Sequence, residues 1–130
     1  MRTIANLKGA EFFRATYNVV EEVEKFNNAT GVMAIWKRQP TFTGNETPEE
    51  KKAIMKAQVQ KNWRDMLKSA LHTNAEATYT FVMCLFVLED GESEPDGMDM
   101  LMGALDLIAD ERVIAFFIKL MNSGLLSIVG

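Results

Sequence analysis

The sequence has very few of the residues that most often build catalytic and metal sites. Among its 130 residues there is one histidine, His72, and one cysteine, Cys84. A single cysteine cannot form a disulfide within the chain, and it is typical of proteins from a reducing compartment. One histidine and one cysteine also cannot provide the four ligands of a structural zinc site. We therefore expect no catalytic site, no metal and no cofactor, in a protein that is not an enzyme.

The surroundings of these two residues favour structural roles. His72 falls at the expected end of a long helix, where the helix dipole favours a partly charged imidazole. Cys84 lies inside the most apolar segment, whereas a nucleophilic cysteine needs an accessible and electropositive setting. Asp and Glu are abundant, so an enzyme with a carboxylate-based site stays an alternative, but no spacing singles out one pair.

Long apolar runs are also absent. The longest, residues 81–88, is far too short to span a bilayer, and residues 1–8 do not resemble a secretion signal. With 48% hydrophobic and 25% charged residues, the composition is that of a folded domain and not of a disordered chain. We expect one cytoplasmic domain that spans residues 1–130, with no membrane contact.

The charged residues are unevenly distributed along the chain. Residues 1–72 hold 12 Lys and Arg against 8 Asp and Glu, a net charge of +4, whereas residues 73–130 hold 2 against 10, a net charge of −8. The two halves could face each other within one fold, or both could be solvated. Alternatively, the basic part of one copy attracts the acidic part of another, which would steer association and give a homo-oligomer.

Hydrophobic periodicity predicts an all-α fold, a compact bundle of about five helices. The first is an amphipathic helix over residues 8–28, with Gly31 placed as its C-cap glycine. Residues 32–38 could be helical, irregular or a short strand, and Pro40 ends this segment in each case. A loop rich in Thr, Gly and Asn is expected over residues 40–47.

Capping residues mark where the later helices begin. Thr47 and Glu50 form a capping box for a helix that should run to about His72. The segment 75–88 is apolar almost all round and predicts a buried central helix, although its β-branched and aromatic content would also suit a buried strand. Thr73 with Glu76 offers a capping box for it, and Asn74 is a competing cap.

An acidic segment broken by glycine and proline, residues 89–97, predicts a second loop. Asp96 can cap a fourth helix over residues 98–109, and Asp110 can cap a fifth. The side chains expected to face inward from the fourth helix are Leu101, Leu105 and Ile108.

Methionines and an apolar tail suggest a surface for a partner. Three methionines alternate at the start of the fourth helix, and they cannot all face the core because a helix turns by about 100° per residue. Flexible thioether side chains suit surfaces that adapt to partners. The tail, residues 125–130, either packs on the bundle or docks on a neighbour. The candidate partner-binding residues are Met98, Met100, Met102, Leu125, Leu126, Ile128 and Val129.

The lysine- and arginine-rich helix over residues 48–72 raises a second hypothesis, a small regulator that binds nucleic acid. Two properties argue against nucleic acid as a partner. The pI is near 5.0, and Glu49, Glu50 and Asp65 interrupt the basic run.

Several segments follow one another in a characteristic order. Residues 29–33 lead from the first helix to Ile35 and to basic residues that end at Pro40, and the apolar segment 81–88 is followed by an acidic break and by a closing helix pair within 101–122. This order resembles that of the tail assembly chaperones of Firmicutes phages and prophages.

The resemblance implies a non-catalytic viral protein of the bacterial host cytoplasm. Members of that family bind the long tape-measure protein before the tail tube polymerises around it. The expectation for this chain is therefore an assembly factor or chaperone for a long helical partner. The family has no catalytic motif, so the resemblance assigns no functional residue. A self-associating structural protein of a prophage remains an alternative.

Overall fold

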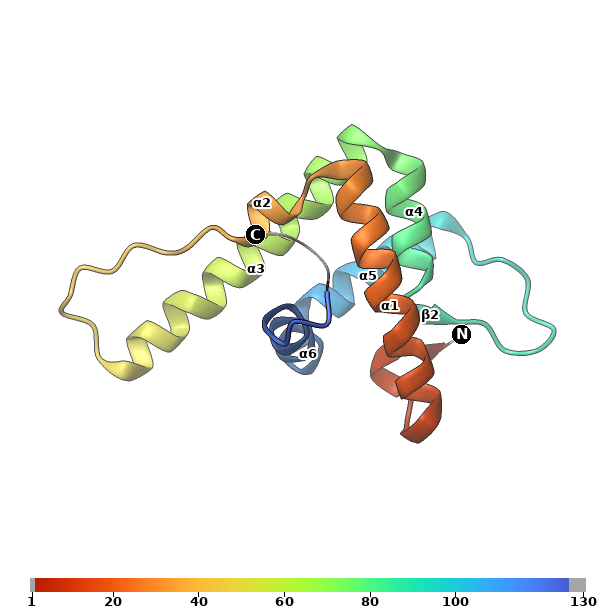
Figure 1. Ribbon diagram of the computed structural model, residues 1–130, viewed down its shortest axis with the longest axis horizontal. Coiled ribbons are helices and arrows are strands. Elements are labelled where there is room, and N and C mark those ends of the chain that lie inside the picture. Colours follow the sequence, from red (N-terminus) through yellow and green to blue (C-terminus); the bar gives the residue numbers. More distant parts are fainter. Residues whose placement is uncertain (1, 127–130) are drawn as a thin grey trace.

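The computed structural model describes residues 2–126 of the chain. These residues form six α-helices and a two-stranded antiparallel sheet, with a short 3-10 helix, η1, after the first strand (Figure 1). The expected all-α fold class is confirmed. The elements are β1 (Arg2–Thr3), η1 (Ile4–Asn6), α1 (Gly9–Thr30), α2 (Met33–Trp36), α3 (Pro48–Thr73), α4 (Ala75–Met83), β2 (Phe86–Val87), α5 (Gly97–Ala109) and α6 (Glu111–Asn122).

Side-chain caps mark where α3, α4, α5 and α6 begin. The Thr47 hydroxyl accepts from the Glu50 backbone N–H at 3.1 Å, and the Glu50 carboxylate accepts from the Thr47 N–H at 3.1 Å, which confirms the capping box of α3. Asn74, and not the alternative box, caps α4. Asp96 and Asp110 cap α5 and α6 as expected.

The segment 32–38 forms the single helical turn α2 and not a strand. Gly31 ends α1 in the left-handed conformation, at a φ of 69°, as its position predicted. The buried amide of Asn62 on α3 then donates to the carbonyl oxygens of Trp36 and Arg38, at 3.4 and 3.0 Å. These bonds hold the C-terminal end of α2 against α3.

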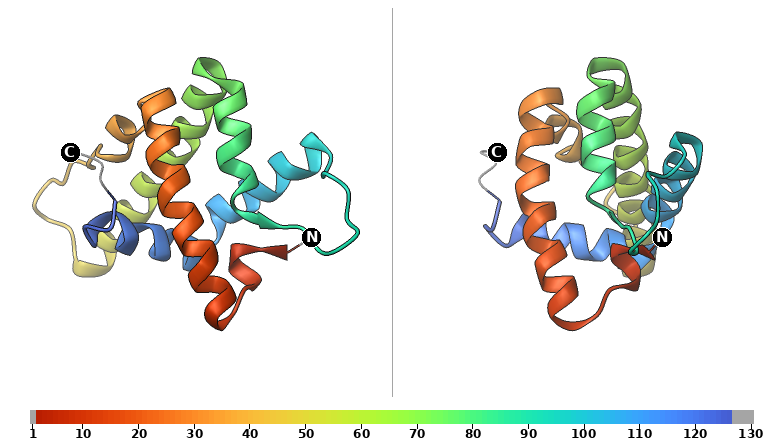
Figure 2. Two further views of the ribbon diagram at one scale, coloured as in Figure 1. Left: turned by 45° about the vertical axis from the view of Figure 1, so that its right-hand side comes forward. Right: turned by 90° about the vertical axis from the view of Figure 1, so that its right-hand side faces the viewer.

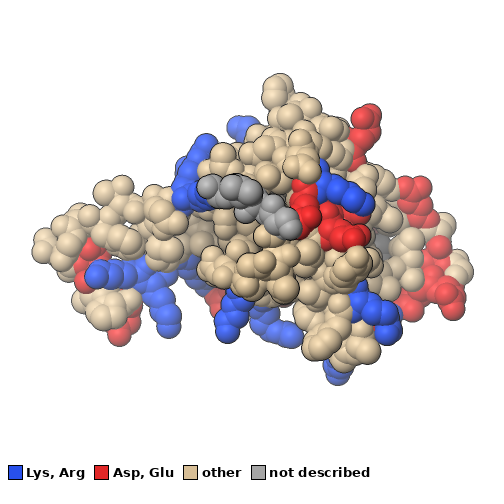
Figure 3. Space-filling model, viewed as in Figure 1, with Lys and Arg blue, Asp and Glu red and all other residues tan. Residues whose placement is uncertain are grey.

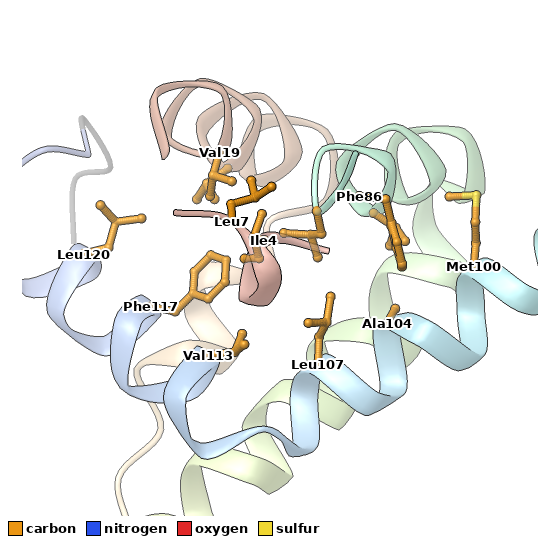
Figure 4. Packing of buried hydrophobic residues seen from close by; sticks show 13 residues of the cluster. Ile4, Leu7, Val19, Phe86, Met100, Ala104, Leu107, Val113, Phe117 and Leu120 are labelled. Atoms are coloured by element: carbon orange, nitrogen blue, oxygen red, sulfur yellow. The ribbon is translucent and has the colours of Figure 1, made fainter. Parts of the chain in front are cut away.

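Helices α1, α4 and α3 lie side by side, and α6 crosses them steeply (Figure 2). The core fills the space between α1, α4, α5 and α6, and the N-terminal strand and 3-10 helix close one end of it (Figure 4). Its buried members are Ile4, Leu7, Val19, Val23, Val82, Leu85, Phe86, Met100, Ala104, Leu107, Val113, Phe117 and Leu120.

The predicted central helix over 75–88 is only partly correct. Helix α4 ends at Met83, and the chain then turns into β2, which pairs with β1. The Ile4 N–H donates to the Leu85 carbonyl at 3.0 Å and so extends this pairing. The end of the apolar segment is a strand because the N-terminus supplies a partner for it, and local sequence carries no sign of that partner.

Arg2 ties three distant segments together beside this sheet. Its guanidinium donates to both carboxylate oxygens of Glu11 on α1, each at 2.8 Å, and it also pairs with Glu89 beyond β2. The hydrogen bonds from Arg2 lower the pKa of Glu11 below its usual value.

Candidate protein-binding surfaces

Helix α5 is apolar on two sides, and only one of them is buried. Its inner side consists of Met100, Ala104 and Leu107, which point into the core in Figure 4. The expectation that Leu101 and Leu105 face inward is therefore wrong, since both are exposed, and Ile108 is half-buried. Gly103 permits the observed rotation because it lets the ring of Phe86 approach the helix backbone closely.

The outer side of α5 carries a continuous apolar stripe. Its members are 70% exposed at Met98, 39% at Leu101, 51% at Met102 and 46% at Leu105. They lie at positions i, i+3, i+4 and i+7, so their side chains share one face of the helix. We call these four residues the α5 face. Helix α5 lies along one side of the molecule (Figure 2), and the exposed fractions of the four side chains show that this face is accessible.

A shallow apolar hollow continues the α5 face toward α3 and α4. It has a volume of about 150 Å³, and Leu71 of α3, Tyr79 of α4 and Leu101 are among its lining residues. All three side chains are more than one third exposed. The hollow therefore widens a helical stripe into a surface to which three helices contribute.

The methionines predicted for partner binding have different positions. Met98 and Met102 belong to the α5 face, as their spacing allowed. Met100 is 2% exposed and packs in the core, so its assignment to a binding surface is wrong. Residues that are two apart on a helix point about 200° apart, so Met98 and Met102 flank one side while Met100 points to the other.

Of the apolar tail, residues 125–130, the structure describes Leu125 and Leu126. Leu125 is exposed, whereas Leu126 packs against the core cluster. The structure thus contradicts a free binding arm at Leu126. The predicted binding residues Ile128 and Val129 lie outside the described residues.

Among residues 2–126, two of the ion pairs join the two halves of the chain. Arg2 pairs with Glu89, and Lys56 of α3 pairs with Glu111 of α6. At these pairs, the basic and acidic halves of the chain face each other within one fold. Much of the acidic segment before α5 remains exposed at the opposite end of the molecule from the N-terminal half of α3 (Figure 3).

Cys84 and His72, the two residues considered for catalysis or metal binding, lie in settings that favour structural roles. Burial, with a smaller contribution from the negative charge of Glu22, raises the pKa of the Cys84 thiol to about 12, so the thiolate is scarce near neutral pH. His72 is exposed in the last turn of α3. Within residues 2–126, no group of three or more His, Cys, Asp and Glu side chains is arranged to hold a metal ion.

Comparisons with known proteins found no relative that could assign a function to these surfaces. Over the described part of the chain, no helix combines the length and apolar character that crossing a bilayer requires. No protein-family model, curated protein or solved structure matches the chain.

Proposed function

We propose that this protein is a non-catalytic binding factor that presents the α5 face to a helical segment of a partner protein. The observation that carries the proposal is the exposure of Met98, Leu101, Met102 and Leu105 at helical spacing. Exposed apolar patches of this kind mark interaction sites, because their burial against a partner is favourable. A stripe at i, i+3, i+4 and i+7 matches the ridges and grooves of another helix.

Within that class, the proposal is a tail assembly chaperone of a phage or prophage, acting in the host cytoplasm on a tape-measure-like protein. The resemblance in the order of segments supports this role, and so does the chemistry of the α5 face. Two of its four members are methionines, which adapt to varied apolar side chains along a long partner. Homo-oligomerisation is part of the same proposal, since many copies would be needed to cover such a partner.

The test is affinity capture with the tagged protein from a host in which prophages have been induced, followed by mass spectrometry. The double variant Met102→Ser with Leu105→Ser removes two apolar side chains from the α5 face. Each contributes about 1–2 kcal/mol on burial, so binding should weaken by roughly 30-fold or more. The matched control, Met102→Leu with Leu105→Met, keeps the apolar surface and should bind as the natural protein does.

One long, helix-rich protein, captured at several copies of the chain per partner and lost with the serine variant alone, would support the proposal. Equal capture of the partner by both variants would show that the α5 face is not its binding site. Recovery of the chain by itself would favour the self-associating structural protein. Capture of nucleic acid with a steep loss on added salt would favour the regulator.

A further inference from the structure

The apolar stripe of α3 continues beyond the part of the helix that packs against the core. Trp63, Met66 and Ala70 of this stripe pack into the protein. Met55 and Val59 extend it toward the N-terminus at spacings of four residues, yet Met55 is exposed. The N-terminal half of α3 projects from the other helices (Figure 1). Within residues 2–126, the N-terminal part of this apolar stripe is therefore left open, whereas its C-terminal part packs against the core.

This open side of α3 and the side of α6 that carries Glu111, Ile114, Ala115 and Ile118 line a hollow, which we call the α3–α6 hollow. Its volume is about 570 Å³, within the range of sites that bind ligands or side chains. The ion pair between Lys56 and Glu111 joins its two walls. Its apolar lining consists of Ala53, Met55 and Val59 from α3 and Ile114, Ala115 and Ile118 from α6.

The hollow has a positive rim. Lys52, Lys56 and Glu111 are its charged lining residues, and because Lys56 pairs with Glu111, the net charge of the lining is +1 and is carried by Lys52. From residue 51 to 64, α3 carries five basic residues and no acidic residue. Figure 3 shows Lys and Arg side chains along this part of the molecule, with some acidic side chains at its tip, and further acidic side chains gather at the other end. An acidic occupant therefore complements the rim electrostatically.

We propose that the α3–α6 hollow binds an acidic amphipathic helix of a partner protein. Two helices form the walls, and the small side chains of Ala53 and Ala115 permit a third helix to approach closely. Lining residues 52–59 extend over about 10 Å, or two helical turns, which matches anchors at i, i+3, i+4 and i+7. Six of its nine lining residues are apolar, and a helix with an apolar face would bury them whereas a phosphate backbone would not, so the hollow favours a helix over nucleic acid. This site is separate from the α5 face and does not depend on it.

The test uses fluorescence anisotropy with the full chain and a panel of labelled 18-residue peptides. Each peptide has apolar residues at i, i+3, i+4 and i+7 and glutamate elsewhere, and a twin panel has lysine in place of glutamate. Members of the acidic panel should bind at least tenfold more tightly than their basic twins. Met55→Ser should weaken binding about tenfold, because it removes an apolar contact.

A charge-reversal pair separates the rim from the general charge of the helix. Lys52→Glu, at the rim, should weaken binding about fivefold, whereas Lys51→Glu, on the same helix but outside the lining, should change it less than twofold. Circular dichroism checks that each variant retains its helices. Equal binding of both panels, or no binding of the acidic panel, would overturn the proposal. So would a dimer in sedimentation that Met55→Ser dissociates, because a second copy would then occupy the hollow. If single-stranded RNA displaced the peptide and Met55→Ser did not change binding, the proposal would be overturned and nucleic acid would be the favoured ligand.

Discussion

Replacing Gly103 by alanine tests the close contact that sets the rotation of α5. An ideal Cβ atom at residue 103 would lie 2.9 Å from both Cε1 and Cζ of Phe86. Carbon atoms pack favourably at about 3.5–4.0 Å, so the ring or the helix would have to move by more than half an ångström. The ring of Phe86 is buried in the core, and its displacement would disturb the neighbouring side chains.

Two opposing effects determine how much Gly103→Ala changes the free energy of unfolding. Alanine within a helix is favoured over glycine by about 1 kcal/mol. Overpacking in a filled core costs about 1–3 kcal/mol. With a mid-range cost of about 2 kcal/mol, Gly103→Ala should lower the free energy of unfolding by about 1 kcal/mol. For a domain of this size, that change lowers the melting temperature by about 3–5 °C.

The matched control is Gly97→Ala, in the same helix. A Cβ atom there meets nothing within 4 Å, so this variant should be neutral or slightly stabilising. Urea unfolding followed by circular dichroism would measure both variants. Phe86→Leu alone should lose stability because it leaves space beside Gly103. Adding Gly103→Ala to that variant should recover part of this loss. A Gly103→Ala protein as stable as the natural one would refute the steric account of how α5 is oriented.

Three further predictions concern other parts of the fold. Asn62→Ala should cost about 1–3 kcal/mol in urea unfolding because it removes the donor to two backbone carbonyls, and a loss below about 0.5 kcal/mol would contradict this. Cys84 should react with a thiol reagent at pH 8 more than a hundredfold faster in urea than in the native state, since folding raises its pKa to about 12; near-equal rates would show the thiol to be accessible. The pKa of Glu11 is lowered in the folded state, chiefly by its hydrogen bonds from Arg2, so its contribution is present above its unfolded value of about 4.5 and is lost as the pH falls through the folded value. The stability difference between the natural protein and Glu11→Gln should therefore shrink from pH 6 to pH 3, and a constant difference would be the contrary result.

The candidate binding surface was only partly predictable from the sequence. Met98 and Met102 are on the exposed side of α5 as their spacing allowed, but Met100 is core. The helical period predicts Leu101 and Leu105 in the core, but both are exposed. Helix α5 is apolar nearly all round, so two different stripes satisfied the same helical period, and periodicity could not choose between them.

Local interactions let the sequence alone determine the starts of α3, α5 and α6 and the end of α1. The capping pair Thr47 and Glu50, the caps Asp96 and Asp110, and the left-handed Gly31 act within a few residues of their own positions, so no other part of the chain is needed to specify them.

Only the tertiary structure decided which apolar side chains became core. Phe86 leaves the expected helix because β1 pairs with β2, and its ring then packs against α5 at Gly103. That contact directs Met100 inward and leaves Met98 and Leu101 outside. Residues far apart in sequence come together only on folding, and their steric fit selects between stripes of equal hydrophobicity.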